Sequence, residues 1–330
     1  MESPLSPSRL HTLPTRIRAS TLDASTSTSS LISPTSTFST LGGFHHVKSQ
    51  LTRHLLWPQP SNPYAAAYTR LHLTPTAGIL LYGPPGTGKT LLASALAGEC
   101  GLPFLSISVS QLVRGYVGES EKQVAKVFAQ ARAVGGGCVV FVDEVDAVFS
   151  GGVGGSELAS KMVAQLVMEL DTCASSSAAS NGDGSTGAGR VVVVAATNHP
   201  WMLSEALVRP GRLDAHVYVG LPDERDRGEI LRNLVANEGE TVTGAEWIAE
   251  VARQTEGYSG ADLKALVVRA RAILAVATQD QEIQGPREQQ KLGIEWAVKQ
   301  ALSKVKPSVK PAEVERFERW MLLSRGACRT

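Results

Sequence analysis

The feature that most limits how this chain can fold is the octapeptide GPPGTGKT at residues 83–90. It directly follows an apolar run, GILLYG (78–83), and leads into a helix-like segment at 88–98. The octapeptide fits the pattern G-x-x-x-x-G-K-[ST], whose glycines let backbone N–H groups wrap around a chain of phosphates. A glycine turn can match this pattern alone. A strand before it and a helix after it favour a phosphate-binding loop in an α/β fold.

The rest of the first two thirds of the chain repeats this strand-then-helix alternation. The strand-like runs are 78–83, 104–109, 138–143, 191–196 and 216–220, and the helix-like segments between them are 88–98, 119–133 and 156–170. Alternating strands and helices predict a parallel sheet with helices on both faces. CVVFV and VVVVAA are apolar throughout, as expected for strands buried on both sides.

Changes in composition divide the chain into segments. Residues 1–37 are rich in Ser, Thr and Pro and lack periodicity, which predicts a disordered tail. The α/β domain is expected over 38–221, with a flexible low-complexity insertion at 173–189. Strand signals stop near Pro222, so 222–330 is expected to form a small all-helical domain ending in a C-terminal helix. Its helix-like segments are 223–238, 244–255, 260–278 and 287–303.

Composition excludes some classes of function. The formal net charge is only +1, so no general attraction to nucleic acid or to membranes is expected, and no apolar run has the length of a membrane span. The four cysteines have no CxxC spacing, which argues against a zinc site and a disulfide framework and favours a reducing compartment. A cytoplasmic location is expected. The alternative is targeting to an organelle, because the tail is poor in acidic residues and contains arginines, as transit peptides do.

The phosphate-binding loop predicts a defined chemistry. Lys89 is expected to reach the β- and γ-phosphates of a nucleotide, and the Thr90 hydroxyl is expected to bind Mg²⁺. The helix that follows adds the positive end of its dipole. The residues of the loop expected to contact nucleotide are Gly83, Pro84, Pro85, Gly86, Thr87, Gly88, Lys89 and Thr90.

Two further strands end in polar residues. CVVFVDEVD places Asp143 and Glu144 at the tip of a buried strand, and VVVVAATN ends with Asn198. Ligands of parallel sheets bind outside the carboxyl ends of the strands. We therefore expect Asp143 to complete the Mg²⁺ shell, Glu144 to polarise the attacking water and Asn198 to orient that water. Each of these signals alone also fits an ordinary loop. Because they follow the phosphate-binding loop in this order along the chain, a functional role is favoured for them.

LVRPGRLD (207–214) carries Arg209 and Arg212 on either side of a Pro-Gly turn. A solvated basic turn is the simplest interpretation of such a segment. Phosphoryl transfer, however, needs positive charge on its transition state, and an arginine supplied in trans can accelerate it by ~10³–10⁵.

GPPGTGKT, VVFVDEVD, AATN and RPGRLD, in this order, resemble the AAA ATPases. The resemblance runs from LGGF (41–44) to ERFERW (315–320) and is closest to the second ATPase ring of valosin-containing protein, Afg-type relatives and peroxisomal biogenesis ATPases. It implies an ATPase with Walker A and Walker B motifs and a helical lid, working with ATP and Mg²⁺ in a homo- or hetero-hexamer. Arginines of one subunit would then complete the neighbouring site. The resemblance adds nucleotide contacts from Gly42, Gly43, Leu91, Gly260 and Ala261.

The resemblance also gives RGYVGES (114–120) a role. In this family the matching loop lines the central pore of the ring and grips a polypeptide substrate, here through Tyr116 and Val117. A glycine-flanked aromatic suits a loop that moves with each ATP cycle. The alternative is a tyrosine folded back onto the core.

Some positions depart from the family pattern. SGGVGG follows DEVDAVF where an arginine is usual, Ser204 replaces a usual aspartate, and FSTLGG lacks the usual acidic residue. The leading hypothesis is protein remodelling by threading through a hexameric ring, possibly through an adaptor. The departures favour an alternative, an ATP-binding scaffold subunit with little turnover. A nucleic-acid motor would need basic residues clustered at the pore, which the near-neutral charge and GYVG argue against.

Overall fold

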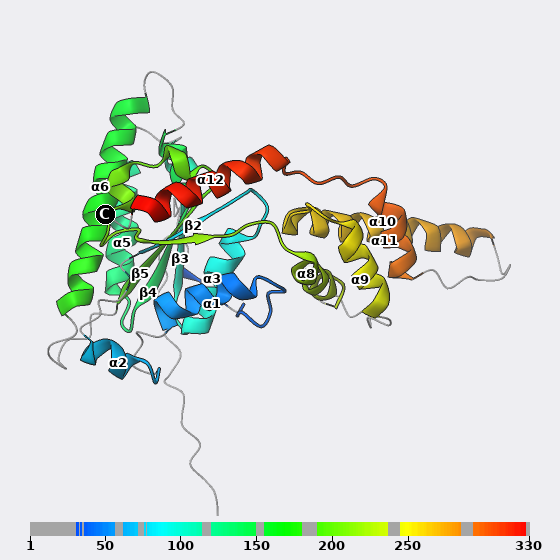
Figure 1. The fold of residues 1–330 in the computed structure, drawn as a ribbon, viewed down its shortest axis with the longest axis horizontal. Coiled ribbons are helices and arrows are strands. Elements are labelled where there is room, and N and C mark those ends of the chain that lie inside the picture. The colour runs from blue at the N-terminus through cyan, green and yellow to red at the C-terminus, as the bar shows by residue number, and fades with distance from the viewer. Residues whose placement is uncertain are drawn as a thin grey trace, which may run out of the picture.

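The computed structural model of the chain describes an α/β domain followed by a helical domain and a returning C-terminal helix (Figure 1). The residues described are 31–32, 34, 36–56, 62–71, 76, 78–113, 120–149, 155–179, 190–236, 245–284 and 293–327.

Five parallel strands form the body of the sheet, in the spatial order β3-β4-β5-β2-β6. Their bounds are β2 (Gly78–Tyr82), β3 (Phe104–Ser108), β4 (Cys138–Asp143), β5 (Val191–Thr197) and β6 (Ala215–Tyr218). The register pairs Tyr82 with both Thr197 and Tyr218. The carboxyl ends of these strands therefore lie at one edge, which confirms the predicted parallel sheet and brings the loops that follow β2, β4 and β5 together.

Both faces of the sheet are buried, because helices cover each of them. Alternate residues of β2 belong to different cores: Leu80 packs toward α5 and α6, and Ile79 and Leu81 pack toward α1 and α3. This alternation is why the central strands are apolar at every position. The helices of the domain are α1 (His45–Leu51), a π-helical turn (Thr52–Leu56), α2 (Ala65–Arg70), α3 (Lys89–Cys100), α4 (Val109–Val113), α5 (Ser120–Ala133), η2 (Val145–Phe149), α6 (Gly155–Ala179), η3 (Pro200–Met202) and α7 (Glu205–Val208).

The end of the predicted disordered tail is part of the fold. β1 (Leu31–Ile32) pairs antiparallel with β3 and covers the outer edge of the sheet. Ser36 lies against Gly98 of α3, where an added Cβ would meet the Ser36 carbonyl oxygen at 2.1 Å, and its hydroxyl lies 3.2 Å from that of Ser94. The ordered domain thus begins before residue 38. Residues 1–30 lie outside the described residues.

The predicted flexible insertion also begins inside a helix. α6 continues to Ala179 because Cys173 packs into the core beneath the sheet, with 2% of its surface exposed. The hydroxyls of Thr172 and Ser175 donate to the carbonyls four residues earlier, which satisfies them within the helix. The prediction for 173–179 is therefore corrected, while 180–189 lies outside the described residues.

The lid is all-helical, as predicted. Its helices are α8 (Glu224–Ala236), α9 (Ala245–Gln254), α10 (Gly260–Gln284) and α11 (Ile294–Leu302). They enclose a core of their own, built around Leu231, Trp247, Ile248 and Leu266. α10 packs against both α8 and α11, so it is the central helix of the lid.

The last helix leaves the lid and returns to the α/β domain. α12 (Pro311–Ala327) crosses beside β2 and α6 in Figure 1. Its Trp320 meets Tyr82 edge-on, with ring centroids 4.6 Å apart, and Phe317 packs on Trp201 at 5.1 Å. The sequence predicted a C-terminal helix after the lid but not its position, and aromatic packing seats α12 on the sheet domain.

Candidate nucleotide site

A cavity of about 650 Å³ lies at the carboxyl edge of the sheet, between the α/β domain and the lid. The sheet domain contributes the phosphate loop and the ends of β4 and β5, and α8 and α10 contribute from the lid. The predicted site residues that line it are Gly42, Pro85, Gly86, Thr87, Gly88, Lys89, Thr90, Leu91, Asp143, Glu144, Asn198, Gly260 and Ala261. Segments up to about two hundred residues apart in sequence thus meet at one cavity, as the parallel topology requires.

The phosphate loop has the backbone geometry of an anion cradle. Gly86 and Gly88 adopt φ of 77° and 90°, a region that residues with a Cβ rarely occupy. An added Cβ at Gly83 would lie 2.1 Å from the Val219 carbonyl oxygen, so only glycine fits where β2 ends. Gly83 and Pro84 support the loop from outside the cavity. They accept hydrogen bonds from the Lys89 ammonium at 2.9 and 2.8 Å.

Lys89 is buried, with 8% of its surface exposed. Burial lowers its pKa to about 8, and the nearby carboxylates of Asp143 and Asp146 offset part of that effect. A phosphate anion favours the charged ammonium, so bound nucleotide would raise this pKa again. We therefore expect the ammonium to bind an anionic ligand in preference to the backbone carbonyls of Gly83 and Pro84.

This shift predicts a pH dependence of nucleotide affinity. Affinity should be constant well below pH 8 and should fall above it by up to about tenfold per pH unit, because the unliganded lysine then loses its proton. Titration with a fluorescent ADP analogue from about pH 7 to 9.5 measures this. Lys89→Arg is the control, since guanidinium does not titrate in that range. An identical fall in both proteins would show that another group is responsible.

Thr90 and Asp143 lie together at the base of the cavity. The Thr90 hydroxyl donates to a carboxylate oxygen of Asp143 at 3.0 Å. Burial raises the pKa of Asp143, and the Thr90 hydrogen bond works in the opposite direction. A hydroxyl and a carboxylate are oxygen ligands of the kind that Mg²⁺ takes beside the phosphates of a nucleotide. The donor set therefore fits this ion.

Glu144 and Asn198 face the same cavity. Glu144 has a φ of 52°, an uncommon value for a residue with a side chain, and its backbone N–H donates to Asp143 at 3.0 Å. The side-chain oxygen of Asn198 is buried and lacks a hydrogen-bond partner among the described residues. A buried acceptor without a partner is costly unless a water or ligand satisfies it. This acceptor thus fits a role in holding a water near Glu144.

The lid closes the cavity from the other side. The Ala261 backbone N–H donates to the Gly86 carbonyl at 2.9 Å, so the first turn of α10 is bound directly to the phosphate loop. Asp262 holds this turn in shape. One of its carboxylate oxygens accepts from the N–H and hydroxyl of both Ser259 and Ser308. Ser259 and Asp262 thus pair as a helix cap at the start of α10, and Ser308 adds the start of the α12 connection to it.

The strap at residues 40–44 lies between the two domains. Gly42 packs on the backbone of α8, where a Cβ would meet the Glu229 carbonyl at 2.7 Å. Gly43 lies beside the cavity, and its N–H donates to the Glu229 carboxylate at 3.0 Å. The Asn233 amide donates to the Thr40 carbonyl at 3.2 Å. Lid side chains thus fasten this strap, although FSTLGG lacks the acidic residue that is usual in the resembling family.

The two predicted arginines lie outside the cavity and have different surroundings. Arg212 binds Asp171 of α6 through two hydrogen bonds of 2.7 and 2.9 Å and also donates to the Ala206 carbonyl. Arg209, at the end of α7, is exposed. Ser204 still caps α7, by accepting from the Ala206 N–H at 3.3 Å. The protomer thus binds the Arg212 guanidinium through Asp171 and leaves Arg209 exposed at the surface.

Some site residues were not predicted from the sequence. Ile230, Asn233 and Leu234 of α8 and Lys264 of α10 also line the cavity. The first three have the spacing of one helical face, but nothing in the sequence says that this face covers a nucleotide. Tyr116 and Val117, the predicted pore residues, lie outside the described residues.

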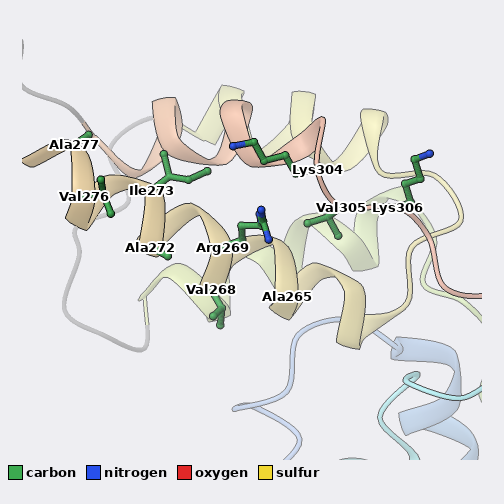
Figure 2. Close-up of a pocket in the computed structure, with 10 residues that line it drawn as sticks. All are labelled: Ala265, Val268, Arg269, Ala272, Ile273, Val276, Ala277, Lys304, Val305 and Lys306. Carbon is green, nitrogen blue, oxygen red and sulfur yellow. The ribbon is translucent and has the colours of Figure 1, made fainter.

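A second hollow, of about 980 Å³, lies on the lid between α10 and the segment that leaves α11 (Figure 2). The residues that line it include the exposed Val268 and Val276 and the basic residues Arg269, Lys304 and Lys306. It shares no residue with the nucleotide cavity.

The described residues contain no group of three or more His, Cys, Asp or Glu side chains that could hold a metal ion. Nor does any helix within the described ranges combine the length and hydropathy of a membrane span.

Comparison with known proteins connects this geometry to a family. Residues 79–221 match the family "ATPase family associated with various cellular activities (AAA)", and residues 248–275 match the AAA+ lid domain. The chain is 39% identical over 290 residues to the Cell division cycle protein 48 homolog of Archaeoglobus fulgidus, which covers 84% of this chain and 36% of that protein. It is 40% identical over 247 residues to the ATPase family protein 2 homolog of Caenorhabditis elegans, 74% of this chain and 31% of that protein.

A third relative is the ATP-dependent zinc metalloprotease FtsH 2 of Symbiobacterium thermophilum. Identity is 41% over 245 residues, covering 73% of this chain and 38% of the relative. The chain thus spans about a third of the length of these curated relatives. The family match spans the phosphate loop, the carboxylates at the end of β4 and the end of β5, and the lid match spans most of α9 and the first part of α10. This chain therefore carries an AAA ATPase domain, a domain that binds and hydrolyses ATP, followed by an AAA+ lid.

Proposed function

We propose that this chain uses ATP hydrolysis to remodel or unfold proteins, by threading polypeptide through the pore of a hexameric ring. The observation that supports ATP hydrolysis is that one cavity is lined by Lys89, Glu144 and Asn198, whose buried side-chain oxygen has no hydrogen-bond partner among the described residues. Support for the remodelling half comes from the relatives. The FtsH relatives are named ATP-dependent zinc metalloproteases, a name that joins ATP to action on polypeptides. RGYVGES supplies an aromatic residue of the kind that grips substrate.

The proposed hydrolysis gives each residue one task. The backbone of the phosphate loop and Lys89 hold the phosphates, and Thr90 and Asp143 hold Mg²⁺, which supplies positive charge to the phosphate oxygens. Glu144 accepts a proton from the attacking water, and the Asn198 oxygen orients that water. An exposed arginine from a neighbouring subunit then stabilises the charge of the transition state. Gly260 and Ala261 couple the state of the phosphate loop to the lid.

The test of remodelling is the ATPase rate with and without a permanently unfolded protein. Wild-type rings are expected to turn over faster with the unfolded protein and to unfold a tagged client. Tyr116→Ala should keep the basal rate and lose both responses, whereas Tyr116→Phe should keep about half or more of them, because the ring provides the contact area. Client unfolding by Tyr116→Ala at the wild-type rate would contradict the pore assignment. A large drop in its melting temperature would place Tyr116 in the core instead.

The same experiment separates the alternative, a scaffold subunit that binds ATP with little turnover. The departures in SGGVGG and at Ser204 favour this alternative. A scaffold would form rings in the presence of ATP, hydrolyse it slowly and ignore the unfolded protein. Slow turnover that rises several-fold with unfolded protein would exclude it.

Two finer proposals accompany the main one. We propose that the domain corresponds to the second ATPase domain of double-ring proteins such as valosin-containing protein, because RPGRLDAHVYVGLPDERDR and ALSKVKPSVKPAEVERFERW carry that likeness. We also propose a cytoplasmic location, with an organelle as the alternative if residues 1–37 act as a transit peptide. Imaging of the chain with a C-terminal tag, with and without residues 1–30, tests the location.

A further inference from the structure

One buried carboxylate joins the two loops that carry Glu144 and Asn198. Asp146 is 7% exposed and lies two residues after Glu144, in the short helix η2. One of its oxygens accepts from the Thr197 hydroxyl at 2.7 Å, and the other lies 2.7 Å from the Nδ1 of His199. Thr197 and His199 are the residues on either side of Asn198. Both chain neighbours of Asn198 are therefore hydrogen-bonded to the loop that carries Glu144, the proposed base.

These bonds restrain the backbone at Asn198. The Thr197 hydroxyl donates to Asp146 and also accepts from the His199 N–H at 2.9 Å, which closes a small ring of hydrogen bonds around the Asn198 peptide. The carboxylate oxygen of Asp146 is the acceptor in this contact, which assigns the donor role to Nδ1 of His199. A charge-assisted bond of this length is short and directional. The separation of Glu144 from Asn198 is thus set by side chains that do not line the catalytic end of the cavity themselves, apart from Thr197.

His199 is supported on its outer side by α12. Its ring meets Trp201 edge-on, with centroids 5.6 Å apart. The Arg316 guanidinium lies 3.7 Å from the centroid of the Trp201 ring, and Phe317 packs against the same tryptophan. Guanidinium and aromatic contacts of this kind are favourable beyond the area they bury. The returning helix therefore fixes the orientation of the histidine that holds Asp146.

We propose that His199 is a positioning residue for ATP hydrolysis, which acts through Asp146 to hold Asn198 at a fixed distance from Glu144. The inference rests on the hydrolytic roles proposed above for those two residues. The attacking water must contact both Glu144 and Asn198 while it faces the phosphate. A misplacement of about 1 Å can lower the rate by up to ~10². Removing the histidine leaves every group that contacts nucleotide in place but frees the loop that carries the amide.

His199→Ala is therefore expected to lower kcat roughly tenfold and to leave KM within about twofold of the wild-type value. Half of the His199 side chain is exposed, so its loss should change the melting temperature little. His199→Asn should recover most of the rate, because its Nδ2 can donate to Asp146 from the position of Nδ1. His46→Ala is the matched control, since His46 is an exposed histidine of α1 that bonds only Gln50 among the described contacts. It should keep the wild-type kcat.

A double-mutant cycle decides whether His199 acts through Asn198. In the Asn198→Ala background, His199→Ala should lower kcat by less than about twofold more, because the amide it positions is already gone. A full tenfold further loss there, or a wild-type kcat for His199→Ala alone, would overturn the inference while wild-type hydrolysis still stands. Equal losses in His199→Ala and His199→Asn would also overturn it. No hydrolysis by wild-type rings would remove the proposed function itself.

Discussion

Glu144→Gln is expected to bind ATP as tightly as the wild-type chain and to hydrolyse it at least about a hundredfold more slowly, since general-base catalysis contributes ~10²–10⁴. The amide has the shape of the carboxylate, so the unusual backbone at this position, with φ of 52°, is not altered. Lys89, Thr90 and Asp143 keep their contacts, so phosphate and Mg²⁺ binding should persist. Single-turnover hydrolysis together with nucleotide-binding titrations measures both halves of this result.

The control is Glu256→Gln, which makes the same chemical change at an exposed lid residue outside the cavity. It should hydrolyse ATP at the wild-type rate. If Glu144→Gln did the same, the base would have to be another group and the proposed role of Glu144 would fall. A loss of nucleotide binding in Glu144→Gln would instead show that this residue supports the phosphate loop.

Arg209→Ala is expected to lower ATP hydrolysis by about 10³, the lower end of what an arginine supplied in trans contributes. The structure distinguishes it from Arg212, because the two bonds to Asp171 fasten Arg212 to α6 of its own protomer. We infer that Arg209 is the guanidinium extended toward the neighbouring site. Arg212 instead links the Pro-Gly turn to α6 and to the Ala206 carbonyl of its own protomer.

Mixed rings test whether the arginine acts in trans. Arg209→Ala subunits keep a sound phosphate loop, and Lys89→Ala subunits keep a sound arginine, so rings that contain both should regain activity that neither pure ring shows. A mixture of Glu144→Gln and Lys89→Ala subunits is the matched control. In it no site has both a base and a phosphate loop, so no recovery is expected. If Arg209→Ala and Lys89→Ala subunits share rings and still show no recovery, the arginine acts within its own protomer or outside catalysis.

Much of this protein could be predicted from local sequence patterns. A strand, a glycine loop and a helix at residues 78–100 require a parallel α/β arrangement, and parallel strands place their carboxyl ends at one edge. Lys89, Asp143 and Asn198 could therefore be predicted to lie together, because each lies at the carboxyl end of a strand or in the loop that follows it. Element types were confirmed along the α/β domain and lid, since periodicity within a segment reports which of its faces are buried.

Other features arise from contacts between segments whose partners no local pattern identifies. The return of α12 depends on Trp320 meeting Tyr82 and on Phe317 meeting Trp201, pairs separated by more than a hundred residues. Cys173 keeps α6 helical past a low-complexity boundary only because the core lies beneath it.

The chemistry divides in the same way. The sequence by itself determined which residues we propose for phosphate, proton and metal chemistry, because those proposals depend on residue type and on position relative to a strand end. Tertiary structure alone decided that Asp171 restrains Arg212 and that His199 and Asp146 hold the loops of Glu144 and Asn198 together. Such restraints are hydrogen bonds between side chains distant along the chain. Their strength depends on distance and direction, which exist only once the backbone is folded.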